Sequence, residues 1–403
     1  MQRQITPDAL ASIEFEVEWN HGGISHTDTY MARKVNFWRD CFPKGFFEAV
    51  MGKQTGDTVG MCLPDNALEF RPDAGRIKTL AANQFEGIRD DGRPIIPEYG
   101  RFYPSGLLRD VPGVFKGNIS PFRCLETDGD RLKADFNHPL AGKPLRVTAR
   151  VKKVFDKIDE RGGTSTAWLE TITDGPGIQA RANGRATDFF TGRPFERPDE
   201  QPDTLFYEKP RMVNHLDSRA RAVVTDIYRR LVPENARVLD LMSSWNSHLP
   251  EDLSCAKVTG LGMNADELRA NSRLTDAVTW DLNRSPALPF DDESRDAVIC
   301  TASIEYLVSP FAVFDEAARI LTKGGVFAVT FSNRWFPPKV TRIWREIHEF
   351  ERMGLVSEYF LESGRYGNIG TCSMRGLARP ADDRHYPAFP ESDPVYAVWG
   401  YKK

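Results

Sequence analysis

Four residues with polar or small side chains follow short apolar runs between positions 237 and 301. Asp240 follows RVL, and Asp281 follows VTW. Gly262 follows KVTGL, and Thr301 follows AVIC. Ligands of open α/β sheets bind beyond the carboxyl ends of the strands. If the apolar runs are parallel strands, these residues line one crevice, where carboxylates and a hydroxyl can form hydrogen bonds with a polar ligand.

The elements that would position these residues alternate between strands and helices. Five short strands are expected between residues 237 and 333, and AARILTKGGVFAVTF supplies a helix, a Gly-Gly turn and the last of these strands. Upstream, Ser218 can cap a helix that leads directly into the first strand. Strands and helices that alternate at this spacing predict a parallel, doubly wound α/β sheet.

The stretch LPFDDESRDAVICTASIEYLVSPFAVFDEAARILTKGG is the most specific motif of the chain. Its LPF, D-E-S and R-x-L-x-x-G-G elements resemble those of class I S-adenosylmethionine-dependent methyltransferases, in particular the type 11 group. The resemblance extends over residues 205–375. It implies a Rossmann-like fold and S-adenosyl-L-methionine as the cofactor.

Two segments depart from the pattern of that family. Its members usually have a glycine-rich loop after the first strand, and they usually end the second strand on an acidic residue that binds the ribose hydroxyls. Here the loop contains Ser243 and Ser244, and the second strand is followed by Asn264. We expect the serine hydroxyls to bind the methionine carboxylate and the amide to replace the ribose carboxylate. A degenerate domain that serves as a scaffold is the alternative.

The resemblance implies a set of cofactor contacts at the strand ends. We expect Asp281 to accept a hydrogen bond from the adenine amino group and Leu282 to pack against the ring. The full predicted set is Asp240, Met242, Ser243, Ser244, Trp245, Gly262, Asn264, Asp281, Leu282, Thr301 and Ser303.

The chemistry expected with this cofactor is nucleophilic attack on a sulfonium methyl carbon. The protein then mainly aligns and desolvates the nucleophile. A thiol needs little activation, whereas an oxygen or nitrogen nucleophile often needs a base. No obvious base is present, which favours a sulfur acceptor, although Glu305 or His215 could serve an oxygen acceptor. The candidate catalytic residues are Tyr207, His215, Glu305 and Tyr306.

Composition excludes several functional classes. The 403 residues carry a net charge of −4 with a pI near 6.1, so we expect no nucleic-acid partner. No apolar run is long enough to span a membrane, and without an apolar stretch near position 1 we expect no signal sequence. Six scattered cysteines favour reduced thiols in the cytoplasm and argue against a metal site. These observations predict a small-molecule acceptor and leave the oligomeric state open.

The first part of the chain differs in character from the rest. Residues 1–155 are rich in β-branched and aromatic side chains. The stretches FFEAVMGKQTGDTV and ADFNHPLAGKPLRVTARV resemble FKBP-type prolyl isomerases of the SlyD branch. The Phe-Asp pair that those enzymes carry in an early loop has no clear counterpart here, so we expect a scaffold role for this α+β domain.

The predicted domain organisation therefore has three parts. An FKBP-like domain at 1–155 is followed by a connector at 156–204 and a methyltransferase domain at 205–403. The aromatic residues of the connector predict that it packs against another part of the protein. The alternative function is that of a prolyl isomerase or folding factor with a vestigial methyltransferase domain.

Overall fold

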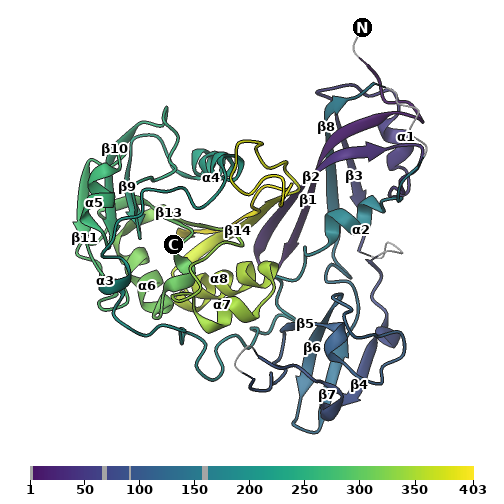
Figure 1. Cartoon of the computed structure of the whole chain (residues 1–403), viewed down its shortest axis with the longest axis horizontal. Helices are drawn as coiled ribbons and strands as arrows, with labels where there is room; N and C mark the ends of the chain where they lie inside the picture. The colour runs from purple at the N-terminus through teal and green to yellow at the C-terminus, as the bar shows by residue number, and fades with distance from the viewer. Residues whose placement is uncertain (1–2, 66–69, 90–91, 157–161) are drawn as a thin grey trace.

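The computed structural model describes residues 3–65, 70–89, 92–156 and 162–403. Its named strands form one sheet of eleven strands and one sheet of four (Figure 1). The larger sheet runs through both halves of the chain, and the smaller sheet is separate from it.

The C-terminal half builds a doubly wound sheet around the predicted strands. Its order is β11 (Asp276–Thr279), β10 (Cys255–Gly262), β9 (Ala236–Leu241), β12 (Arg295–Thr301), β13 (Leu321–Phe331), β15 (Val395–Lys402) and β14 (Tyr366–Arg375). The first five strands are parallel, and β15 is antiparallel to both of its neighbours. The strand order reverses between β9 and β12, which makes this the switch point of the sheet. The predicted α/β arrangement is confirmed.

Helices cover both faces of this sheet. Helix α4 (Ser218–Leu231) packs on one face, against alternate residues of the strands that include Ile299. The opposite face, to which Cys300 belongs, is covered by α6 (Pro310–Ile320), α7 (Arg342–Glu346) and α8 (Glu349–Ser363). Helix α5 (Ala265–Ala270) lies beside β10 and β11. Cys300 is completely buried within its strand.

Strand β13 begins at Leu321, and the predicted Gly-Gly turn lies in the irregular segment between its Leu321 and Val326 pairings with β12, where Gly324 has a φ of 78°. One local prediction in this half is wrong. The N-cap of α4 is Asp217 and not Ser218. One Asp217 carboxylate oxygen accepts hydrogen bonds from the amides of Arg219 and Ala220 at 2.9 and 3.0 Å. A carboxylate forms stronger charge-assisted bonds than a hydroxyl and also interacts favourably with the helix dipole.

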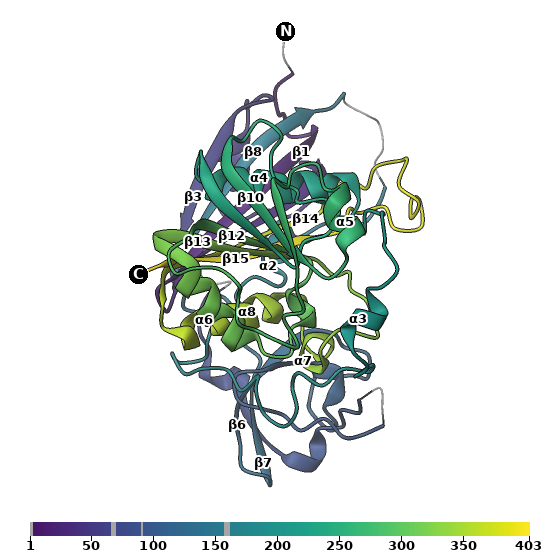
Figure 2. The ribbon, with the colours of Figure 1, turned by 90° about the vertical axis from the view of Figure 1, so that its left-hand side faces the viewer.

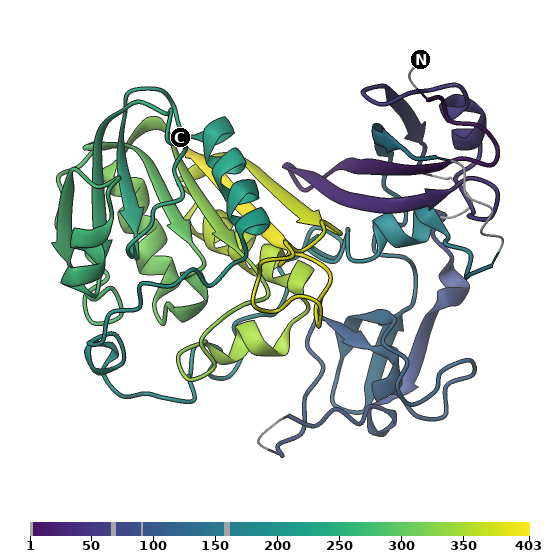
Figure 3. The ribbon, with the colours of Figure 1, turned by 45° about the horizontal axis from the view of Figure 1, so that its top comes forward.

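The first part of the chain extends the same sheet. Strand β2 (Ile24–Asn36) pairs in parallel with β14, and β1 (Leu10–His21), β8 (Leu145–Val154) and β3 (Thr58–Leu63) follow it (Figure 3). Buried side chains also cross this joint. The Ser373 hydroxyl donates to Asp28 at 2.7 Å, and His26 is hydrogen-bonded to Thr371 at 2.8 Å. The first and last parts of the chain therefore share one hydrogen-bonded sheet.

The smaller sheet is inserted between β3 and β8. It consists of β4 (Ile77–Ala81), β7 (Arg131–Asp135), β6 (Pro121–Thr127) and β5 (Phe102–Pro104), which project away from the large sheet (Figure 2). It has its own small core, in which Phe122 and Leu132 are buried. The N-terminal region is thus β-rich, as predicted, and its similarity to FKBP-type isomerases stays a prediction.

The connector packs against both halves of the chain, as its aromatic residues predicted. Its helix α2 (Trp168–Thr173) lies against the N-terminal sheet, near α1 (Phe46–Val50). The Trp168 ring stacks on Phe15 with a centroid distance of 5.9 Å, and its indole nitrogen donates to Asp40 at 2.9 Å. Further along, Phe190 packs against Phe311 and Tyr359 on the C-terminal half. Helix α3 (Asp203–Phe206) ends the connector.

Within the described residues, no helix combines the length and the apolar character that crossing a membrane would require.

We expect the purified protein to show weak or no prolyl isomerase activity. The acidic loop pair of that family is not evident, and the apolar side chains of Phe15 and Phe46 are buried, with Trp168 stacked on Phe15. A protease-coupled assay on a proline-containing tetrapeptide measures the rate. Turnover comparable to that of an authentic isomerase would contradict the scaffold role.

Candidate functional site

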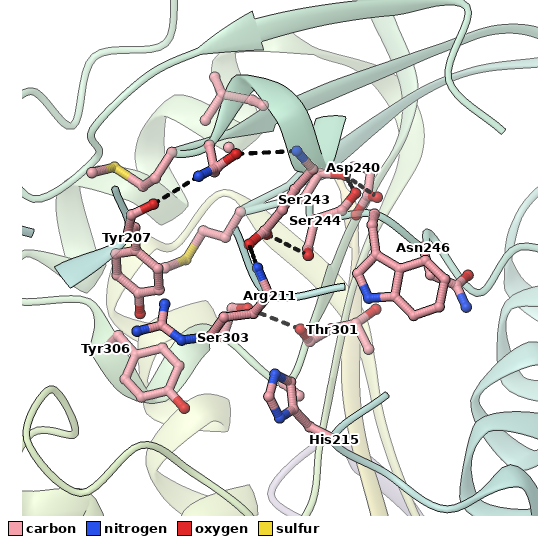
Figure 4. A pocket seen from close by; sticks show the side chains of 18 of the residues that line it. Tyr207, Arg211, His215, Asp240, Ser243, Ser244, Asn246, Thr301, Ser303 and Tyr306 are labelled. Atoms are coloured by element: carbon pink, nitrogen blue, oxygen red, sulfur yellow. Dashed lines mark hydrogen bonds between the residues drawn. The ribbon is translucent and has the colours of Figure 1, made fainter. Parts of the chain in front are cut away.

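A crevice lies at the carboxyl ends of β9, β10 and β12, beside the switch point (Figure 4). Every predicted cofactor residue lines it, as do Tyr207, His215 and Tyr306. Glu305 does not. Several further residues line the crevice without a role predicted from the sequence, and these are Asp203, Val213, Asn214, Leu216, Arg221, His248, Leu261, Glu267, Trp280, Asn283 and Ala302.

The loop after β9 comes very close to the end of β10. The Ser243 amide donates to the Leu261 carbonyl at 2.8 Å, and Met242 adopts a left-handed conformation with a φ of 58°. A Cβ atom on Gly262 would lie only 2.1 Å from the Ser243 carbonyl oxygen. Glycine is therefore required at the end of β10, where it lets two backbone segments meet at the crevice.

Asp240 is buried beneath this loop. One of its carboxylate oxygens accepts a hydrogen bond from the Ser243 hydroxyl at 2.6 Å. Burial raises the pKa of Asp240 to about 7, and hydrogen bonds from Ser243 and Ser247 counteract part of that rise. The Ser243 hydroxyl thus points to Asp240, whereas the predicted role for it was to bind a methionine carboxylate.

Both polar groups of the Asn264 side chain form hydrogen bonds within the protein. Its side-chain oxygen caps α5 by accepting from the amides of Asp266 and Glu267 at 3.0 and 3.1 Å. Its nitrogen donates to the carbonyls of Tyr207 and Glu208 at 2.9 and 3.0 Å. Asn264 therefore positions the segment that crosses the crevice, and its side chain has little capacity left for a ribose.

Glu267 supplies a carboxylate shortly after β10, where members of the similar family usually have an acidic residue that binds the ribose hydroxyls. Its two oxygens accept hydrogen bonds from the Arg211 amide and the Ser244 hydroxyl, each at 2.6 Å. Sequence analysis missed this residue because it lies on a helix after the strand end. The pattern Asn-x-x-Glu across 264–267 marks a helix start and could have drawn attention to it.

Residues 203–216 form a strap over the mouth of the crevice. The Trp245 indole donates to the Val213 carbonyl at 3.1 Å, which holds the strap to the β9 loop. At its start, Asp203 forms ion pairs with Arg197 at 2.9 Å and with the completely buried Lys339 at 3.1 Å. These contacts place Tyr207, Arg211 and His215 at the crevice.

Aromatic side chains form one wall of the crevice. Tyr306 stacks on Phe336 with a centroid distance of 5.8 Å, and His215 meets the edge of Phe336 at 4.9 Å. Burial lowers the pKa of His215, and the positive charge of Arg211 lowers it further, so the imidazole is neutral near pH 7. A neutral imidazole can accept a proton. Trp335, next to Phe336 in the sequence, packs against Arg352 and does not line the crevice.

Glu305 lies one layer behind the crevice wall. It is completely buried and within hydrogen-bonding range of Tyr306. Burial raises the pKa of Glu305 to about 8, and its Oε2 has no hydrogen-bond partner among the described residues. The sequence placed Glu305 in the pocket, but a direct contact with a ligand would have to pass Tyr306. This position could not be read from the spacing because Glu305 and Tyr306 lie in one turn of a short 3-10 helix, η5 (Ile304–Tyr306).

No metal centre is evident in the described ranges. Within them, His, Cys, Asp and Glu side chains do not gather in any group of three that could hold an ion. The six cysteines are all free thiols.

Comparison with known proteins locates a family within the C-terminal half. Residues 244–329 match the methyltransferase domain family, which confirms that part of the predicted resemblance. No curated protein matches the chain.

Solved structures align with the same half at low identity. A chain of the complex between the Haloferax volcanii Trm112 methyltransferase activator and a methyltransferase is 18% identical, with 46% of this chain and 90% of that chain covered and a TM-score of 0.37. A SAM-dependent methyltransferase of Thermotoga maritima is 18% identical, with coverages of 46% and 90% and a TM-score of 0.34. A methyltransferase of Mesorhizobium loti is 13% identical, with coverages of 44% and 96% and a TM-score of 0.31.

We expect Asp281→Ala to weaken S-adenosylmethionine binding by about 1–3 kcal/mol, the cost of an unpaired buried donor. Amides of Asn283 and Arg284 donate to one Asp281 oxygen and fix the carboxylate in the crevice. Calorimetric titration measures the dissociation constant. Asp276→Ala, which removes an exposed carboxylate of β11, is the control and should bind as the wild type does. Unchanged affinity in Asp281→Ala would refute its placement at the adenine.

We expect Asp240→Asn to stabilise the protein at pH 8 and to have little effect near pH 4. The folded pKa is raised to about 7 from 3.8, so ionisation destabilises the folded state as the pH rises between these values. The amide removes that penalty. Thermal unfolding at several pH values measures the difference in melting temperature between the variant and the wild type. Each kcal/mol of unfolding free energy shifts the melting temperature by roughly 2–4 °C. A difference in melting temperature that does not change with pH would show that Asp240 is not the titrating group.

Proposed function

We propose that this chain is an S-adenosylmethionine-dependent methyltransferase that acts on a small-molecule acceptor. The observation that carries the proposal is the crevice at the switch point, which lies within the same half of the chain as the segment matched by the methyltransferase domain family. Its donors and acceptors suit a nucleoside with an amino-acid tail. When bound there, the cofactor would supply an electrophilic methyl group on a sulfonium.

The residues of the crevice divide into three groups in this proposal. Asp281 and Leu282 bind the adenine, and Glu267 accepts hydrogen bonds from the ribose hydroxyls. The loop at 243–246 contacts the methionine end, where Ser244 is already oriented by Glu267. Gly262 allows the backbone of this loop to approach the end of β10. These residues would align the cofactor with the acceptor and exclude water, and they would form no covalent bond with either.

The acceptor that we propose is a small thiol or sulfide. It would lie against Tyr306 and Phe336, where the aromatic wall excludes water, and methylation would give a methanethiol or dimethyl sulfide type of product. A sulfur nucleophile needs little activation, which is consistent with a Glu305 carboxyl that is buried behind Tyr306 and has a raised pKa. The neutral His215 at the mouth is the group that could accept a proton from an oxygen acceptor.

Binding and turnover test the proposal separately. Calorimetric titration with S-adenosylmethionine and S-adenosylhomocysteine shows whether the crevice takes the cofactor. Incubation with hydrogen sulfide, methanethiol and matched alcohols and amines, with detection of S-adenosylhomocysteine, then identifies the acceptor class. Lack of cofactor binding would refute the enzyme assignment, and turnover of only an alcohol or an amine would refute the sulfur acceptor.

We expect Glu305→Gln to retain methyl transfer, with a loss of less than about 10²-fold, because a thiolate needs no general base. Initial rates with hydrosulfide measure the effect. The variant should also unfold at a higher temperature than the wild type at pH 9, since the cost of ionising the buried carboxyl grows as the pH rises from its usual pKa of 4.5 to the folded pKa of about 8, and the amide removes that cost. A much larger loss in a folded variant that binds the cofactor would identify Glu305 as a base.

A further inference from the structure

Two arginine side chains line the crevice without a carboxylate partner in the described parts of the chain. The Arg211 guanidinium donates a hydrogen bond from Nη2 to the Phe206 carbonyl at 3.0 Å, and its buried Nη1 has no partner among the described residues. The Nε atom of Arg221 is also buried and has no partner within the same ranges. Neither residue forms a salt bridge with any described side chain, whereas neighbouring Arg197 is paired with Asp203.

The two cations lie at different ends of the crevice. The Arg211 guanidinium extends from the strap toward Tyr207 and Tyr306, and it lies 4.4 Å from the Phe206 ring centroid and 5.3 Å from that of Phe336 (Figure 4). Arg221 lies in the first turn of α4, and its charge acts on His248, which follows the β9 loop. Arg211 therefore belongs to the aromatic wall, and Arg221 belongs to the loop side.

An unpaired cation is unfavourable in such surroundings. A charge that is removed from water needs a partner of opposite sign or full hydrogen bonding to offset its desolvation. The aromatic faces around Arg211 provide cation–π attraction, but they cannot accept the hydrogen bond that Nη1 could donate. An anion placed between Tyr306 and the strap would satisfy this donor. A ligand with an ammonium group at the same position would be repelled.

We propose that Arg211 binds the negatively charged group of the acceptor, so that the enzyme selects an anionic sulfur nucleophile such as hydrosulfide or a thiolate. This inference rests on the function proposed above. Arg221, on the loop side, then binds the carboxylate at the methionine end of the cofactor. The guanidinium increases the fraction of bound acceptor that is ionised, because a nearby positive charge lowers the pKa of a thiol.

The charges balance in the resulting transfer. The acceptor sulfur forms a bond to the methyl carbon while the bond between that carbon and the sulfonium sulfur breaks. The electron pair of the broken bond stays on the cofactor sulfur, so the anion and the sulfonium give two neutral sulfur centres. No proton remains to be removed, and no base is needed at the wall.

Substitution of each arginine by methionine separates the two roles. Arg211→Met should bind S-adenosylhomocysteine as the wild type does, within about twofold, and should raise the KM for hydrosulfide roughly tenfold or more, the usual effect of losing a hydrogen bond to a charged group. Arg221→Met should weaken S-adenosylhomocysteine binding by a similar factor. It should leave the binding of 5′-methylthioadenosine, which lacks the amino-acid carboxylate, unchanged. Arg219→Met, on an exposed position of α4, is the matched control for both measurements.

The outcomes distinguish this inference from the proposed function. Weaker binding of S-adenosylhomocysteine but not of 5′-methylthioadenosine by Arg211→Met would assign Arg211 to the cofactor carboxylate and overturn the inference. An unchanged KM for hydrosulfide would also overturn it. Arg211→Lys, which keeps the charge, should recover part of the loss. A wild-type protein that does not bind S-adenosylhomocysteine would refute the proposed function itself, and one that binds it but methylates only neutral or cationic acceptors would refute the inference alone.

Discussion

The parallel pairing of β2 with β14 is the interaction on which the architecture of this protein depends. Without it, β14 would end the C-terminal sheet with an exposed row of amide and carbonyl groups, which is an aggregation hazard in any sheet. The pairing covers that edge and joins the two halves through main-chain hydrogen bonds. Asp28 beside the joint is completely buried, and it is tolerated because Trp19 and Ser373 donate to its two oxygens. The N-terminal half is therefore part of the sheet that carries the crevice.

The crevice itself depends on a second set of contacts, which hold the strap at 203–216. Asn264 and Glu267 belong to the start of α5, and both bind the backbone of the strap, at Tyr207, Glu208 and Arg211. The start of α5 thus lines the crevice and also holds the strap in position. This arrangement explains how a chain without the usual glycine-rich loop can form a defined pocket. The close backbone approach occurs at Gly262, and side chains perform the rest of the positioning.

Charge is distributed unevenly around this pocket. Two buried acids have raised pKa values, Asp240 at about 7 and Glu305 at about 8, and neither is close enough to an arginine to form a salt bridge in the described chain. Arg211 and Arg221 likewise lack carboxylate partners there. Among the charged residues that line the crevice, Asp203 is paired, with Arg197 and Lys339, whereas Arg211, Arg221, Asp240, Glu267 and Asp281 form no salt bridge within the described residues. These unpaired groups are the positions where ligands would complete the electrostatics. In the proposed function, the cofactor and the acceptor bind to these unpaired groups.

The sequence by itself determined the C-terminal sheet and the edge at which its polar residues gather. Apolar runs and helix signals are local properties, and parallel strands bring their carboxyl ends together, so Asp240, Gly262 and Thr301 could be placed at one crevice before the structure was known. Only the tertiary structure decided which side chains face that crevice. Glu305 lies behind Tyr306, and the Asn264 side chain forms hydrogen bonds with the backbone of the strap. Glu267, which the strand pattern did not indicate, lines the crevice and accepts a hydrogen bond from the Arg211 amide. These outcomes depend on side-chain directions and on partners distant in sequence. The same is true of the β2–β14 pairing, because the sequence of an edge strand does not specify which strand will pair with it.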